Sequence, residues 1–235
     1  MTPRHHLDPA TVLSHAAGAL PHALSVVVAT HLEGCATCRD AVARAEGIGG
    51  LLVNQQLAQP SLQARANELR AAMLDRLDSV PLAPSRAATE NSRFDNGPDN
   101  SPTEKSKDPD RIPTPLQPYF GESYRALKWR WMGPGMHFIR RGGPSGSNLL
   151  MLRIGPGKRM PVHSHGGSEI TQILSGAYDD ALGHFAPGDV ADLDCEIEHQ
   201  PVTTPGVPCI CVSALDAPLR FPGWLAQRLQ PMYGI

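Results

Sequence analysis

A stretch rich in proline and polar residues divides this chain into two parts. Residues 83–118 carry prolines at seven positions, with Phe94 and Ile112 among the few large apolar residues between them. Such a stretch cannot bury enough apolar surface to offset the entropy that it loses on ordering. We therefore expect a flexible linker over 83–118, between one domain at residues 1–82 and another at 119–235. The alternative is an ordered loop that wraps around one domain.

Helical periodicity dominates the first part. Asp8 followed by Pro9 is a typical helix start, and Pro21 ends that helix. A second helix repeats apolar residues at i, i+3, i+4, i+7 and i+8, and its stripe includes a histidine: Leu24, Val27, Val28, His31 and Leu32. A third helix should end near residues 49–50, and a fourth should cover about 61–77. The pattern predicts a small all-α bundle of four helices.

The second part changes to short apolar or alternating runs separated by glycine and proline. These runs cover 136–140, 148–154, 169–174 and 208–215. Strands with this spacing and with glycine-proline turns between them are typical of an all-β, antiparallel sandwich or barrel. The sequence therefore predicts a two-domain protein, all-α first and all-β second.

The charge balance excludes some partners. The 235 residues contain 21 Lys and Arg against 23 Asp and Glu, a net charge of -2. This balance lacks the basic field that drives phosphate binding, so direct nucleic-acid binding is not expected. The longest apolar run near the N-terminus falls far below the ~20 residues of a membrane span and lacks the layout of a signal peptide. We expect a cytoplasmic protein with no membrane partner.

A cluster of metal-ligating residue types lies at the junction of the second and third helices. His31, Cys35 and Cys38 are spaced at i, i+4 and i+7, so one imidazole and two thiolates converge. A tetrahedral zinc ion needs one further ligand, and His5 or His6, just before the first helix, could supply it. Zinc would contribute on the order of 10 kcal/mol to the folding of so small a bundle.

This motif resembles that of the zinc-binding anti-sigma domain. The similarity covers about residues 1–80 and rests on His31, Cys35 and Cys38 with the upstream His6. It implies zinc held by these four residues and the capture of a group IV (extracytoplasmic-function) sigma factor. Redox-switched members of that group have a cysteine where this chain has His6. A histidine cannot form a disulfide, so we expect this chain to read its signal elsewhere.

A second motif lies in the β-rich part and matches the first cupin motif at every spacing. Gly157 and Gly176 flank His163, His165 and Glu169. Residues i and i+2 of a strand share a face, so both histidines should point into the barrel, and Glu169 should join them. The second cupin motif is degenerate, but it keeps a histidine, His199, as the fourth ligand. Three histidines and one glutamate suit zinc, manganese or iron.

Other candidate residues carry less information. Cys209 and Cys211 share one face of a predicted strand and form a candidate redox pair, although buried structural cysteines are common. Cys195 is interpreted as a bystander in an acidic run. His137 and His184 are expected to be structural or solvated.

The two motifs together resemble the ChrR-type anti-sigma factors, which join a zinc-binding anti-sigma domain to a cupin domain. The resemblance implies a non-enzymatic regulator of transcription that holds a group IV sigma factor in a one-to-one complex. It also implies release of that sigma factor under oxidative stress by singlet oxygen or organic peroxides, sensed through the cupin domain. By the same resemblance the helical domain should wedge between the two sigma domains, with the fourth helix as a clasp.

Two rival hypotheses remain open. The chain could be a cupin metalloenzyme, a dioxygenase or isomerase, with a small regulatory zinc domain, because the cupin fold does not fix one function. It could also be a zinc-stabilised interaction module whose cupin domain senses nothing.

Overall fold

The computed structural model describes residues 2–56, 60–78, 108–142 and 148–222. Most of the predicted linker, residues 83–107, lies outside this range. Within it, the five α-helices are α1 (Pro9–Ala16), α2 (His22–Gly34), α3 (Ala36–Gln55), α4 (Pro60–Asp78) and the short α5 (Gln117–Phe120). Two 3-10 turns flank α5: η1 (Thr114–Leu116) and η2 (Tyr124–Ala126). No helix among these residues is long and apolar enough to cross a membrane.

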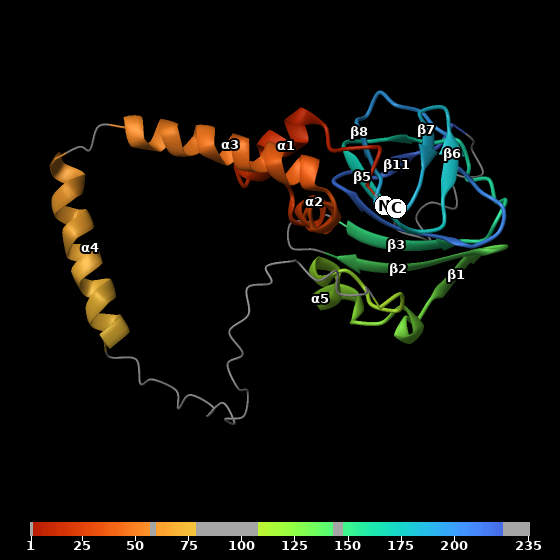
Figure 1. The fold of residues 1–235 in the computed structure, drawn as a ribbon, viewed down its shortest axis with the longest axis horizontal. Coiled ribbons are helices and arrows are strands. Elements are labelled where there is room, and N and C mark those ends of the chain that lie inside the picture. Colours follow the sequence, from red (N-terminus) through yellow and green to blue (C-terminus); the bar gives the residue numbers. More distant parts are fainter. Residues whose placement is uncertain (1, 57–59, 79–107, 143–147, 223–235) are drawn as a thin grey trace, which may run out of the picture. The chain divides into compact units, whose positions relative to one another are not determined.

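The C-terminal part is antiparallel β-structure. Its strands are β1 (Arg130–Gly133), β2 (Met136–Gly142), β3 (Asn148–Ile154), β4 (Ser164–His165), β5 (Glu169–Ser175), β6 (Tyr178–Asp180), β7 (Gly183–Phe185), β8 (Val190–Leu193), β9 (Val202–Thr203), β10 (Cys209–Leu215) and β11 (Leu219–Arg220). They form a six-stranded sheet in the order β1-β2-β3-β10-β5-β8 and two smaller sheets, β7-β6-β9 and β11-β4. The neighbouring strands β2 and β3 of the large sheet lie side by side in Figure 1. The four predicted runs correspond to β2, β3, β5 and β10, so the all-β prediction is confirmed. The described strands do not close into one continuous barrel.

The N-terminal helices begin as the sequence predicts. The Asp8 side chain accepts a hydrogen bond from the Ala10 N–H, and Pro9 stands at the first position of α1. In α2, Leu24, Val27, Val28 and His31 are at most 1% exposed, because a stripe at this spacing faces one side of a helix.

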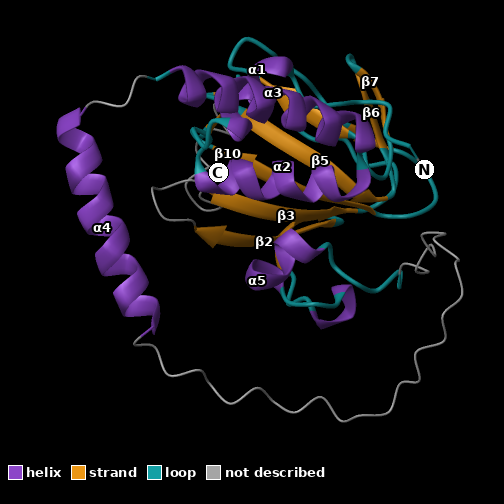
Figure 2. Cartoon of the chain, turned by 60° about the vertical axis from the view of Figure 1, so that its left-hand side comes forward, coloured by secondary structure: helices purple, strands orange, loops and turns teal. Residues whose placement is uncertain are grey.

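Helix α2 packs on the large sheet. It lies across β10, β5 and β3 (Figure 2). Its buried residues join one apolar core with sheet residues, among them Met151, Ile170 and Val212. The described residues up to Gly49 and from Asp108 onwards accordingly form one compact unit, and the described residues from Gly50 to Asp78 belong to another. This division differs from the boundaries predicted at residues 82 and 118, because α2 buries its stripe on the sheet and not against the other helices alone.

The end of the predicted linker is folded. Residues 108–118 belong to the β-containing unit, and the side chains of Ile112 and Leu116 are 1% and 0% exposed. The Gln117 side-chain amide donates a hydrogen bond to the Ile112 carbonyl. The linker prediction is therefore wrong for residues 108–118, since two apolar anchors outweigh the proline-rich composition around them.

The predicted four-helix bundle also needs correction. Helix α3 does not end near residues 49–50 but continues through both glycines to Gln55, although each glycine costs about 1 kcal/mol relative to alanine. Only Cys38 and Val42 of its 20 residues are buried. Helix α4 lies within the second compact unit, and its described side chains, residues 65–76, are exposed.

Candidate metal centres

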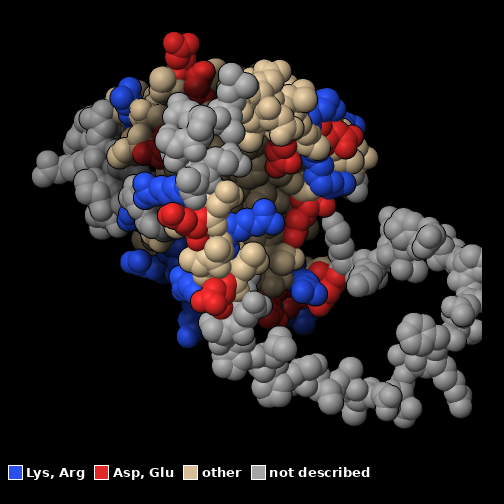
Figure 3. Space-filling model, turned by 90° about the vertical axis from the view of Figure 1, so that its left-hand side faces the viewer, with Lys and Arg blue, Asp and Glu red and all other residues tan. Residues whose placement is uncertain are grey.

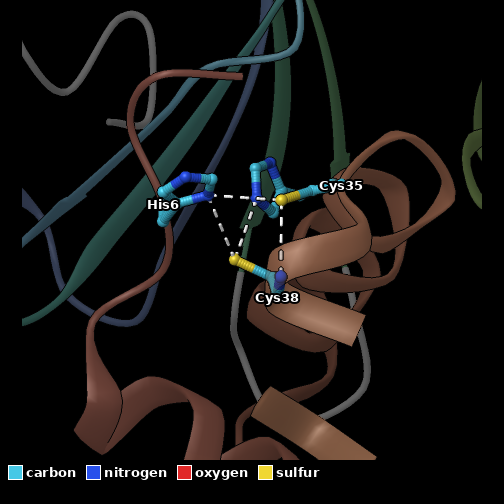
Figure 4. Close-up of side chains that lie close together, drawn as sticks. His6, Cys35 and Cys38 are labelled. Carbon is cyan, nitrogen blue, oxygen red and sulfur yellow. Dashed lines mark hydrogen bonds between the residues drawn. The ribbon is translucent and has the colours of Figure 1, made fainter. Parts of the chain in front are cut away.

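Four side chains converge between the N-terminal segment and the junction of α2 and α3. One ligand atom from each of His6, His31, Cys35 and Cys38 lies within 4.8 Å of the others. His6 Nδ1 lies 3.2 Å from Cys35 Sγ and 3.6 Å from Cys38 Sγ (Figure 4). His31 Nε2 lies 3.3 Å from Cys38 Sγ. A tetrahedral ion with Zn–N and Zn–S bonds of about 2.0–2.3 Å separates its ligands by about 3.3–3.8 Å. The four side chains fit such an ion.

Local backbone geometry sets up this helical cluster. The Cys35 N–H donates to the His31 carbonyl and ends α2 in an extended conformation, so α3 starts directly afterwards. The Cys38 N–H points at Cys35 Sγ, 3.4 Å away. Such an N–H at a helix start stabilises a negatively charged thiolate.

The structure distinguishes the two neighbouring histidines. The His5 ring stacks on Phe185, with 4.1 Å between centroids, and its Nε2 lies 3.1 Å from the His184 carbonyl oxygen. His5 therefore points away from the cysteines, and the His6 ring alone of the pair joins the cluster.

Burial sets the protonation states of this cluster. It raises the pKa of the Cys38 thiol to about 11 and lowers the pKa of the His31 imidazole. The neutral imidazole is the form that binds a metal, whereas the thiol must lose its proton. Metal binding at the helical cluster therefore releases a proton.

A second group of buried histidines lies inside the β-structure. Ligand nitrogens of His163, His165 and His199 lie within 4.8 Å of one another, and Nε2 of His163 is 3.2 Å from Nε2 of His199. The backbones of His163 and His199 exchange two hydrogen bonds of 3.1 and 3.0 Å, which place both rings side by side. This β cluster unites the three histidines of the predicted cupin site.

Glu169 lies beside this group. Its Oε2 is 2.9 Å from His165 Nε2, and its Oε1 accepts hydrogen bonds from the hydroxyls of Thr171 and Ser213. Burial alone would raise the pKa of this carboxyl, but His165, His163 and Thr171 together lower it to about 2. His165 Nε2 is buried and lacks an aligned hydrogen-bond partner. An anionic carboxylate 2.9 Å from one imidazole nitrogen, beside the nitrogens of two further histidines, fits a cation at this site.

Each histidine of the β cluster is oriented through its other ring nitrogen. His163 Nδ1 faces the Pro161 carbonyl at 2.9 Å, and His165 Nδ1 faces the Asp194 carbonyl at 3.4 Å. His199 Nδ1 lies 3.0 Å from Oδ2 of Asp180, whose side chain is fully buried. Such partners fix the tautomer of metal-binding histidines. Sequence reasoning missed Asp180, because it stands outside both cupin motifs, 19 residues before His199.

A cavity of about 50 Å³ opens beside the β cluster. Its walls include His163, His199 and Glu169, and also Tyr178, Cys209 and Cys211. A hydrogen bond with Cys209 and burial raise the pKa of the Cys211 thiol well above its usual range. Both cysteines are buried thiols, and their predicted redox role stays a prediction.

The remaining candidates lie outside these clusters. Cys195 is exposed and free. His184 is half-exposed and lies 2.7 Å from Oδ1 of Asp179, and His137 is partly buried on β2. Neither histidine is part of a metal-ligating group among the described residues.

Comparisons with known proteins cover both the helices and the β-structure of this chain. Residues 122–217 match the family described as ChrR Cupin-like domain. Along its whole length the chain is 37% identical to the Anti-sigma-E factor ChrR of Cereibacter sphaeroides, over 237 aligned residues that cover all of both chains. The fold is similar to a crystal structure of Rhodobacter sphaeroides SigE in complex with the anti-sigma ChrR. That match has a TM-score of 0.69 and 27% identity, and it covers 92% of this chain and 100% of that one.

Proposed function

The chain belongs to the ChrR family of anti-sigma factors, and we propose from this that it captures a group IV sigma factor in a one-to-one complex and thereby regulates transcription. The full-length identity to an anti-sigma factor carries the proposal. The similarity to a chain crystallised with a sigma factor supports it. Capture takes place in the cytoplasm, where sigma factors meet RNA polymerase.

The surface of α3 supports capture. Ile48, Leu51 and Leu52 are spaced at i, i+3 and i+4 on this helix and are 57%, 63% and 59% exposed. Three large apolar side chains on one helix face, outside the core, are typical of a protein-binding surface. We call Ile48, Leu51 and Leu52 the α3 stripe and propose that it contacts the sigma factor.

Helix α4 offers a second surface of the same kind. Leu69 and Met73, one turn apart, are 62% and 65% exposed. As the clasp of the complex, α4 would bury this pair against the second sigma domain.

Acidic and basic side chains are interspersed over the face shown in Figure 3. This mixture favours a protein partner over a nucleic acid.

The two clusters have different roles in this proposal. The helical cluster of His6, His31, Cys35 and Cys38 holds zinc and has a structural role. The β cluster, with Glu169 as a further ligand, holds zinc, manganese or iron and senses singlet oxygen or an organic peroxide. An oxidant alters this metal site or Cys209 and Cys211, and the change reaches the helices or exposes the complex to proteolysis. The position of both cysteines on the cavity beside the histidines supports this step.

Co-purification of the full chain with the group IV sigma factor of its own organism tests the proposal. We expect a one-to-one complex with one zinc ion at the helical cluster and a second metal at the β cluster. Cys35→Ala should lose zinc and sigma binding together, whereas His163→Ala should lose only the second metal. Failure of the wild-type chain to retain a sigma factor would contradict capture.

The cavity beside the β cluster favours one rival, a cupin metalloenzyme that acts on a small molecule. Iron in the purified chain, with substrate-dependent oxygen uptake in the absence of any sigma factor, would support the enzyme instead.

A further inference from the structure

The turn at residues 186–189, between β7 and β8, contacts the helical cluster from the β-structure. The carbonyl oxygen of Gly188 lies 3.0 Å from Nδ1 of His31. The Nδ1–H of His31 therefore donates a hydrogen bond to the Gly188 carbonyl. This tautomer leaves Nε2 of the same ring, which faces Cys38 Sγ, free for a metal. The turn thus occupies the place of the outer partner that orients a metal-binding imidazole.

The same turn holds the segment that carries His6. Asp189 is 2% exposed, and its Oδ1 accepts the backbone N–H groups of Arg4 and His5 at 2.5 and 3.0 Å. Its Oδ2 accepts the N–H of Ala186 within the turn, at 2.9 Å. Arg4 and His5 directly precede His6, so the carboxylate fixes the backbone from which the His6 ring reaches the cysteines.

Strand β8 keeps this turn from moving freely. It continues from Asp189 and pairs with β5 over four residues. Along β8, Asp192 Oδ2 accepts the N–H of Asp8 at 2.9 Å, which holds the far side of His6. Both flanks of His6 are therefore hydrogen-bonded to one edge of the sheet.

We propose that Gly188 and Asp189 are positioning residues of the helical metal centre, although they belong to the cupin domain. The Gly188 carbonyl orients His31 and the Asp189 carboxylate places His6, so two of the four ligands depend on the β-structure. Retention of metal at the helical cluster therefore depends on the β-structure as well as on the helices that carry the ligands. This inference rests on the proposed metal binding by that cluster and does not depend on sigma capture.

Cobalt(II) is the probe that separates the two centres. A cobalt ion bound by Cys35 and Cys38 gives a sulfur-to-cobalt charge-transfer band in the near ultraviolet, and the three histidines of the β cluster give none. The full chain is loaded with cobalt, and the decay of this band is followed after addition of excess EDTA. Asp189→Asn keeps the size of the side chain but removes one acceptor oxygen and the charge.

We expect Asp189→Asn to speed the loss of cobalt by about 10- to 100-fold, because substitution of an outer partner typically lowers metal affinity by that factor. Amide hydrogen exchange at Arg4 and His5 should accelerate in the same variant. Asp110→Asn is the matched control, because the Asp110 carboxylate also accepts a hydrogen bond from a backbone N–H, that of Arg125 at 3.1 Å. In the described part of the chain, this carboxylate is hydrogen-bonded to no residue of either cluster. This control should lose cobalt at the wild-type rate.

A second variant guards against misfolding of the turn. Arg4→Pro removes one N–H that Asp189 accepts and leaves residues 186–189 unchanged, and we expect it to speed cobalt loss as well. Wild-type rates in both Asp189→Asn and Arg4→Pro would overturn the inference. Absence of the charge-transfer band from the wild-type chain would instead overturn the proposed metal binding itself.

Discussion

The α3 stripe permits a quantitative test of sigma capture through the double variant Leu51→Gln, Leu52→Gln. The two side chains are 63% and 59% exposed, so about three fifths of each remains to be buried by a partner. Complete burial of a leucine is worth about 1.5–3 kcal/mol, so each contributes about 1–2 kcal/mol on binding. The pair then accounts for about 2–4 kcal/mol, or about a 30- to 700-fold change in Kd.

Isothermal titration calorimetry with the purified sigma factor measures this change. Glutamine has nearly the helix propensity of leucine, and both positions are exposed, so thermal unfolding should be unchanged. Val207→Gln is the control, since Val207 is 59% exposed in the loop between β9 and β10. A double variant that binds the sigma factor as tightly as the control would refute the role of the α3 stripe.

Three further predictions concern the two metal centres. His163→Ala should leave the Kd for the sigma factor within about twofold of wild type, because His163 is not part of the proposed α3 stripe. The same variant should abolish induction of a sigma-dependent reporter by singlet oxygen. Loss of basal sigma inhibition in this variant would contradict the separation of capture from sensing. Asp180→Asn should weaken metal binding at the β cluster by about 10- to 100-fold in a competition titration, and unchanged affinity would show that the buried contact with His199 does not orient the ring. Because burial raises the pKa of the Cys38 thiol to about 11, zinc affinity at the helical cluster should fall about tenfold per proton released for each unit by which the pH is lowered from 8 to 6. Calorimetric titrations at pH 6, 7 and 8, in buffers of different ionisation enthalpy, measure this affinity and the protons released. A constant affinity would contradict thiol deprotonation.

Local patterns account for what the sequence predicted. The capped start of α1, the buried stripe of α2 and the strands β2, β3, β5 and β10 each depend on residues within a few positions of one another. The same holds for His31, Cys35 and Cys38, whose spacing follows from the end of one helix and the start of the next. His6 and His199 were predicted through resemblance to known motifs, and the structure places both in their clusters.

Contacts between distant residues account for what the sequence did not predict. The stripe of α2 indicates burial, but nothing in its periodicity says that the covering surface is a sheet formed more than 100 residues later. Gly188 lies 157 residues from His31, and Asp180 lies outside both motifs. Ile112 and Leu116 show the converse case, in which two apolar anchors fold a stretch whose average composition predicts a linker.

The distribution of buried residues gives the proposed metal centre at the start of α3 a specific role. Helix α2 buries seven of its 13 residues and is held by the sheet, whereas α3 buries only Cys38 and Val42 of its 20. Packing therefore holds α3 less firmly than α2, and in our proposal the bonds of Cys35 and Cys38 to the metal hold the start of α3. Since the α3 stripe lies on this same helix, loss of the metal should release the binding surface while α2 and the β-structure stay folded. In this proposal the helical centre would act as a fixed base for the helix that carries the α3 stripe, rather than as a staple for a free-standing bundle.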